Sequence, residues 1–182
     1  MPRVNSLLPL LLAAAAMSAA DAQPQIQRLN PTAFRTVPGN VRNSLLEMGC
    51  TIPQDVEALH ARKTVNVIRG RFVNSRRSDF AALCSRAGLS KIVVIHSMSG
   101  EALFEFEERT DESYTQSWTD GTMQFSRRIS RVTSRALARN IRKGNGAAPE
   151  RWREGIDDYF VGKASTVHYH QTGGWRTVTG AD

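Results

Sequence analysis

Residues 79–108 read DFAALCSRAGLSKIVVIHSMSGEALFEFEE, and this stretch decides the fold. Residues 91–96 are mostly apolar and β-branched, which predicts a buried strand. In residues 101–108 the apolar side chains alternate with glutamates, so we expect a half-buried strand with an acidic outer face. Residues 79–85 are compatible with helix or strand, because Ala-Ala-Leu tolerates both. We therefore expect a mostly antiparallel sheet to form around this stretch.

The segments on either side extend the sheet and supply helices to cover it. Residues 64–73 are β-branched and predict a further strand, and residues 123–129 predict an edge strand. The tail STVHYHQTGGWRTVTG predicts a β-hairpin with its turn at Gly173-Gly174. Helices are expected over residues 38–49, 131–143 and 149–160. The predicted fold class is α+β, a mostly antiparallel sheet with a C-terminal β-hairpin and two or three covering helices.

The amino-terminal residues MPRVNSLLPLLLAAAAMSAADAQ have the pattern of a signal peptide, with a positive charge, a short apolar run and a small-x-small cleavage motif. Cleavage is expected before Gln23, so residues 1–22 form the signal peptide. Residues 23–37 are then an extended arm, and residues 38–182 form a single α+β domain. No segment of the chain has the length and apolarity of a transmembrane helix. The sequence therefore predicts an exported protein, periplasmic or secreted, with no transmembrane segment.

Cys50 and Cys84 are the two cysteines of the chain, and an even count in an exported protein favours a disulfide. The bond would close a loop of roughly 35 residues and stabilise the fold by about 3 to 4 kcal/mol in the chain-entropy description. The alternative is a pair of buried free thiols.

Charge is distributed in blocks along the chain, whose formal net charge is +7. Residues 101–126 carry seven acidic residues and one basic residue, whereas residues 127–153 carry nine basic residues and one acidic residue. The helix expected over 131–143 presents a stripe of four arginines, namely Arg131, Arg135, Arg139 and Arg142. This stripe is a candidate anion-binding face; the alternatives are pairing with the acidic block and a solvated face. Nucleic acid is not expected as a partner, because no aromatic residues interleave with the arginines to stack on bases.

The run His96–Gly100, HSMSG, resembles the nucleophile elbow of lipases. Ser97 would be the nucleophile, and Asp157 and His168 follow it in the chain order that such hydrolases use. Two features oppose this interpretation. The position two residues before the serine holds the bulky Ile95, and the run leads into a predicted strand rather than a helix. The alternative is a polar turn whose serines make local hydrogen bonds.

His168 and His170 are separated by one residue, which places both imidazoles on one face of a strand as half of a zinc site. A third ligand would come from Asp157, Asp158 or His60, although no spacing requires any of them. The alternative is an exposed pair of histidines on the hairpin. Val167, before the pair, and Tyr169, between the two histidines, would then be the core residues. No cofactor or metal is predicted for the chain.

Residues 67–95 resemble one strand–loop–strand unit of FG-GAP repeats of integrin-type β-propellers. The resemblance rests on Gly70, Phe72, Asp79, Phe80 and Ala81. The calcium loop of that family is rich in aspartate, whereas residues 73–78 read VNSRRS, so the resemblance implies no calcium site here. A single unit also excludes a propeller.

Several longer stretches are similar to a family of small exported bacterial proteins. They are GCTIPQ (49–54), NVIRGRF (66–72), DFAALCS (79–85) and KASTVHYHQTGGWRTVTGAD (163–182). The resemblance implies a strand rather than a helix over 79–85, and it brings no activity with it.

The function expected from these observations is a non-catalytic binding or structural module of the cell envelope or the extracellular space. Its expected partner is an anionic envelope component or another protein. The alternative is a small hydrolase that uses Ser97 with Asp157 and His168, or a zinc ion at His168 and His170.

Overall fold

The structure is a computed structural model, and it describes residues 26–74, 76–144 and 149–180. It confirms the predicted α+β class. The helices are η1 (Pro31–Ala33), α1 (Gly39–Glu47), α2 (Val56–His60), η2 (Glu112–Tyr114) and α3 (Ser134–Lys143). The strands are β1 (Arg28–Leu29), β2 (Ile52–Pro53), β3 (Val67–Gly70), β4 (Asp79–Arg86), β5 (Leu89–His96), β6 (Ala102–Glu105), β7 (Arg109–Thr110), β8 (Thr115–Ser117), β9 (Met123–Phe125), β10 (Arg127–Val132), β11 (Gly155–Phe160), β12 (Ser165–Gln171) and β13 (Gly174–Thr179).

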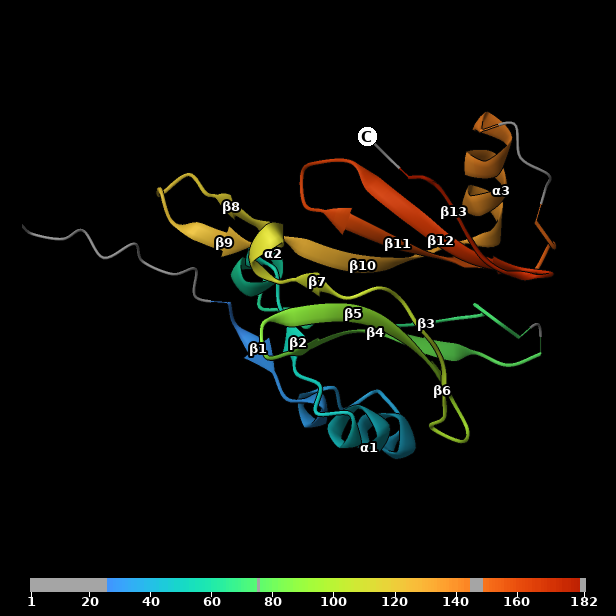
Figure 1. Cartoon of the computed structure of the whole chain (residues 1–182), viewed down its shortest axis with the longest axis horizontal. Helices are drawn as coiled ribbons and strands as arrows, with labels where there is room; N and C mark the ends of the chain where they lie inside the picture. The colour runs from blue at the N-terminus through green and yellow to red at the C-terminus, as the bar shows by residue number, and fades with distance from the viewer. Residues whose placement is uncertain (1–25, 75, 145–148, 181–182) are drawn as a thin grey trace, which may run out of the picture.

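Two antiparallel sheets form the body of the molecule. The first sheet has the order β3-β4-β5-β6, and β7 also pairs with β5. The C-terminal sheet has the order β10-β11-β12-β13. The sheets stack on each other, with α1 on the outer side of the first sheet and α3 on the outer side of the C-terminal sheet (Figure 1). The hairpin predicted for the tail is β12 and β13, but it belongs to this second sheet rather than to one common sheet.

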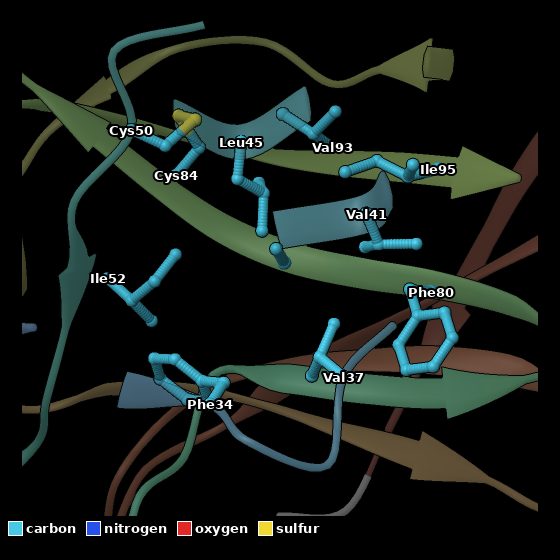
Figure 2. Close-up of a cluster of buried hydrophobic side chains, with 11 residues drawn as sticks. Phe34, Val37, Val41, Leu45, Cys50, Ile52, Phe80, Cys84, Val93 and Ile95 are labelled. Atoms are coloured by element: carbon cyan, nitrogen blue, oxygen red, sulfur yellow. A yellow bond between two sulfur atoms is a disulfide. The ribbon is translucent and has the colours of Figure 1, made fainter. Parts of the chain in front are cut away.

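The central strands β4 and β5 are buried on both faces, which explains their continuous apolar sequence. Successive side chains of a strand point to opposite faces. Phe80, Val93 and Ile95 therefore pack under α1, together with Val41 and Leu45 of that helix (Figure 2). The Cys50–Cys84 disulfide lies within this cluster and ties the segment after α1 to β4, as the sequence predicted.

A second apolar cluster lies between the two sheets. Leu83, Ile92 and Val94 of the first sheet pack there against Ile129 and Ile156 of the C-terminal sheet. A third cluster joins α3 to the outer face of the C-terminal sheet through side chains that include Leu137, Ile141, Val167 and Tyr169. The predicted core role of Val167 and Tyr169 is thereby confirmed.

Several predicted elements differ from the structure. The half-buried strand expected over 101–108 is the shorter β6, which is exposed along its whole length. The helix expected over 149–160 is instead the strand β11, because its backbone completes the ladders of both β10 and β12. The helix expected over 131–143 begins at Ser134, after the N-cap Thr133, and Arg131 belongs to β10. The strand expected over 123–129 is divided at Ser126 into β9 and β10.

Within the described ranges, no helix has the length and apolarity needed to cross a membrane.

Candidate ligand-binding site

A cavity of about 510 Å³ lies between the two sheets, beside the outer strands β6 and β13. Strands from both sheets contribute to its lining. Six rings line it, those of Phe104, Phe106, Tyr114, Phe160, His168 and Trp175. Its volume is within the range of small-molecule sites, and its combination of rings with a few polar groups is typical of such sites.

Phe106 is the centre of the aromatic wall. Its ring centroid lies 4.5 Å from that of His168, 4.8 Å from that of Trp175 and 4.9 Å from that of Phe104. Phe104 also lies 5.4 Å from Trp175 across the gap between the sheets. The alternating pattern of 101–108 correctly predicted that Phe104 and Phe106 share one face. That face is only partly covered, since Phe104 is 38% exposed.

An ion pair between Arg127 and Asp158 forms the buried charged part of the lining. Arg127 donates from Nε to Oδ1 of Asp158 at 2.9 Å and from Nη2 to Oδ2 at 2.8 Å. Its Nη1 donates to the hydroxyl of Ser90 in the first sheet at 2.9 Å. The guanidinium carbon also lies 4.3 Å from the ring centroid of Tyr114. Each guanidinium nitrogen is thus engaged, although the side chain is only 2% exposed.

The electrostatics of this pair favour its charged form. Burial alone would raise the pKa of Asp158, but hydrogen bonds and charge from Arg127 and His168 lower it to about 2. Burial alone would lower the pKa of Arg127, but Asp158 raises it above its ordinary value. Burial raises the pKa of Tyr114, so its phenol stays protonated at neutral pH. The lining also holds Glu107 and Arg109, whose side chains pair at 3.6 Å, so its two positive and two negative charges balance.

His168 lies between this ion pair and the aromatic wall. Its Nε2 is 3.9 Å from Oδ2 of Asp158, and its ring packs on Phe106. His170 faces the same side of β12, next to Trp175, with a ring-centroid distance of 5.7 Å. The predicted common face of the two histidines is correct, and both lie partly buried between the sheets.

The structure does not bring together the residues of the hydrolase alternative. The carbonyl of Ser97 accepts a hydrogen bond from Asn40 of α1, on the outer side of the first sheet. Asp157 lies on the α3 side of the C-terminal sheet, because it pairs in register with Val167 of the α3 cluster. His168 lies between the sheets. The predicted nucleophile, acid and base thus occupy three different layers.

The run 96–100 has the hydrogen bonds of a turn between two antiparallel strands. The amide of Gly100 donates to the carbonyl of His96 at 2.9 Å. The hydroxyl of Ser99 lies 2.9 Å from Nδ1 of His96 and accepts from the amide of Glu101 at 3.2 Å. The chain then enters β6 and not a helix, in agreement with the polar-turn alternative.

The surroundings of His168 and His170 do not resemble a zinc site. No group of three histidine, cysteine, aspartate or glutamate side chains suited to a metal occurs among the described residues. Nη1 of Arg153 lies 3.3 Å from Nδ1 of His170, and a guanidinium at that position repels a second cation. Burial and this arginine lower the pKa of His170. The contact is therefore consistent with a neutral His170 that accepts a hydrogen bond from Arg153.

The predicted arginine stripe is divided by the start of α3. Arg135, Arg139 and Arg142 are exposed on the helix, whereas Arg131 lies on β10 and its Nη1 is 3.8 Å from Glu154. Within the residues that the structure describes, no ion pair joins the three helical arginines to the acidic block of 101–112. The acidic block pairs instead with other residues, such as Lys91, whose Nζ is 2.6 Å from Glu105.

The sequence did not identify the residues that matter most for this cavity. Arg127 carried no signal beyond its place in a basic block, and Asp158 was considered only as a third zinc ligand. Trp175 is one of three tryptophans in the chain, and no sequence pattern singles it out. Trp175 gains its role from Phe106 on the other sheet. Arg127 gains its role from Ser90 on the other sheet and from Asp158 on the neighbouring strand.

No protein-family model matches the chain, and no curated protein or solved structure is significantly similar to it. The resemblance to small exported bacterial proteins therefore stays a prediction.

Proposed function

We propose that this protein is an exported, non-catalytic binding module that holds a small ligand with a flat apolar ring between its two sheets. The observation that carries the proposal is the contact of Phe104 and Phe106, on one sheet, with Trp175 and His168, on the other. Aromatic rings at such separations leave ring faces and edges on which a planar ligand stacks.

The polar lining restricts the ligand further. Arg127 pairs with Asp158 and Arg109 pairs with Glu107, so the charges of the lining balance and the site does not select a strongly charged ligand. Thr166 and Thr177 supply hydroxyls at the cavity lining that are suited to orient a ligand through one or two hydrogen bonds. A neutral molecule with one ring system and few polar substituents fits this combination.

The test uses the neutral probe N-phenyl-1-naphthylamine and a protein in which Trp118 and Trp152 are replaced by phenylalanine. Trp175 is then the only tryptophan, and probe binding should change its fluorescence. Phe106→Ala should weaken binding by about tenfold, since it removes a ring contact worth roughly 1 kcal/mol together with buried area. Met98→Ala, which alters an exposed turn outside the cavity, is the matched control and should bind normally.

A blocking variant separates loss of contact from loss of folding. Thr166 is exposed at the cavity, so Thr166→Trp should fill the space and abolish binding while the melting temperature stays near that of the parent. Unchanged probe binding in both Phe106→Ala and Thr166→Trp would refute the cavity as the site.

Export is the second part of the proposal, and the disulfide is weakly consistent with it. Mass spectrometry of the protein recovered from its source should give a mature chain that begins at Gln23. An intact amino terminus in a cytoplasmic fraction would refute export.

A further inference from the structure

A second hollow lies at the opposite edge of the two sheets, where β3 and β10 are neighbours. Its volume is about 310 Å³, and its lining consists of Arg69, Gly70, Arg71, Ser78, Arg131 and Glu154. Three of these six residues are arginines, from two different sheets. The tertiary structure therefore assembles a basic site that no single segment contains.

The arginines of this hollow exceed the negative charge that faces them. Arg69 and Arg71 are exposed, and neither forms an ion pair within the described part of the chain. Glu154 is the acidic residue in the lining and is only 7% exposed. One of its oxygens accepts from the backbone amide of Arg71 at 2.8 Å, and the other faces Arg131 at 3.8 Å. Two guanidinium groups are left to face an incoming anion.

Arg131 lines both this hollow and a second one. It also lines a space of about 380 Å³ between β10 and α3, to which Lys143 adds another cation. The remaining lining includes the uncharged polar side chains of Ser130, Thr133 and Asn140. Asp157 also lies there as the acidic residue of this lining, and burial raises its pKa.

We propose that these two hollows, which share Arg131 and which we call the basic groove, bind an acidic polysaccharide. Guanidinium groups match carboxylate and sulfate groups with paired hydrogen bonds. The hydroxyl and amide side chains of the adjoining hollow suit the hydroxyls of sugar rings.

Two features of the lining favour this class over other polyanions. Among the described residues, none of those that line the basic groove is aromatic, so bases of a nucleic acid would find no stacking surface. The arginines Arg69, Arg71 and Arg131 lie in a recess, which a flexible chain enters more readily than the flat surface of a bilayer. The proposal is independent of the cavity at the other edge of the sheets.

The test measures binding of a heparin oligosaccharide and of alginate oligosaccharides to the full oxidised protein by calorimetry at low and high salt. Replacing Arg69, Arg71 and Arg131 by glutamine should weaken binding by at least about tenfold, since several charge-assisted hydrogen bonds are lost. The matched control replaces Arg35, Lys63 and Arg86, three exposed cations outside the groove, by glutamine and removes the same net charge. It should weaken binding by less than about threefold, the effect of long-range charge alone.

Three further results would overturn the proposal. The first is an equal loss of affinity in the groove variant and in the control, which would indicate only non-specific attraction. The second is a loss confined to a variant with Arg135, Arg139 and Arg142 replaced by glutamine, which would place binding on the outer face of α3. The third is stronger binding to an oligothymidylate or to phosphatidylglycerol vesicles than to either oligosaccharide. The melting temperature of each variant shows that it is folded.

Discussion

Arg127 and Asp158 form a doubly hydrogen-bonded ion pair between the sheets, with N–O distances of 2.9 and 2.8 Å. The two residues lie on neighbouring strands, β10 and β11, and both side chains are nearly covered, at 2% and 12% exposure. Ser90 of the first sheet accepts a further hydrogen bond from Arg127, so the pair also joins the sheets. A buried pair of this kind is most sensitive to the loss of one partner, because the other then stays buried without its counter-charge.

Asp158→Asn should lower the free energy of unfolding by about 3 to 5 kcal/mol, because it leaves the buried Arg127 without its counter-charge. Asp157→Asn is the matched control. Asp157 is adjacent in sequence but lies on the other face of β11, and burial disfavours its charged form. The control should therefore change stability by less than about 1 kcal/mol. Urea unfolding of the oxidised proteins measures both, and equal losses would contradict the role given to the pair.

The carboxyl groups should titrate in a defined order. The pKa of Asp158 is lowered from 3.8 to about 2 in the folded protein. Its contribution to stability is therefore complete above about pH 4 and is lost as pH falls from 3.8 towards 2. Burial raises the pKa of Asp79, which gives the opposite sign, because protonation of Asp79 favours the folded state as pH falls.

Carboxyl carbon NMR titration of the folded protein tests this order directly. The signal of Asp158 should move last on acidification, after that of Asp79. The reverse order would show that the Arg127 contact is weaker than the structure indicates.

Asn66 should be the most important uncharged polar side chain for joining the two sheets. Its amide donates to the carbonyls of Pro53 at 2.6 Å and Arg127 at 3.2 Å, and its Oδ1 accepts from the amide of Ile129 at 2.9 Å. Asn66→Ala should cost at least about 3 kcal/mol, since three buried backbone groups lose a partner. Asn43→Ala, on the exposed side of α1, should stay within about 0.5 kcal/mol of the parent in the same urea unfolding assay. If Asn66→Ala lowered the free energy of unfolding by less than about 1 kcal/mol, water would have to replace these hydrogen bonds.

The turn between β5 and β6 should tolerate no side chain at Gly100. Gly100 has φ +76°, and a Cβ there would lie 2.8 Å from the carbonyl oxygen of Asn40. Gly88 has a similar φ of +79°, but a Cβ there would meet nothing within 4 Å. Gly88→Ala should thus cost about 1 to 2 kcal/mol from conformation alone. Gly100→Ala should cost a further 1 to 3 kcal/mol or so, because α1 must shift. Thermal unfolding of the two variants compares them, and equal melting temperatures would show that the contact with α1 is absent.

The disulfide should contribute substantially to stability. Replacing Cys50 and Cys84 by alanine should lower the free energy of unfolding by about 3 to 4 kcal/mol. The bond joins residues that are 34 positions apart, and its loss gives the unfolded chain more conformational freedom. Dithiothreitol should lower the stability of the parent by a similar amount and leave the double variant unchanged. A parent that is insensitive to the reductant under unfolding conditions would show that the bond is absent in solution.

Local pattern was sufficient to predict most strands and the disulfide. The apolar run of β5 predicts a buried strand, and the alternation in 101–108 assigns Phe104 and Phe106 to one face. Residues 79–85 were compatible with helix or strand, and the ladders with β3 and β5 make them the strand β4. The tail hairpin follows from the glycine pair at its turn. Residues 149–160 were wrongly expected to be helical, because β11 depends on the strands at its two sides and not on its own composition.

Fold class and the cysteine pairing follow from short-range information, such as side-chain period, turn residues and the count of two cysteines. The division into two stacked sheets does not, because the identity of a neighbouring strand is a long-range property. The candidate cavity and the basic groove both depend on that division. Phe106 contacts Trp175, and Arg69 and Arg131 line one hollow, only after the sheets have packed, since the members of each pair are distant in the chain.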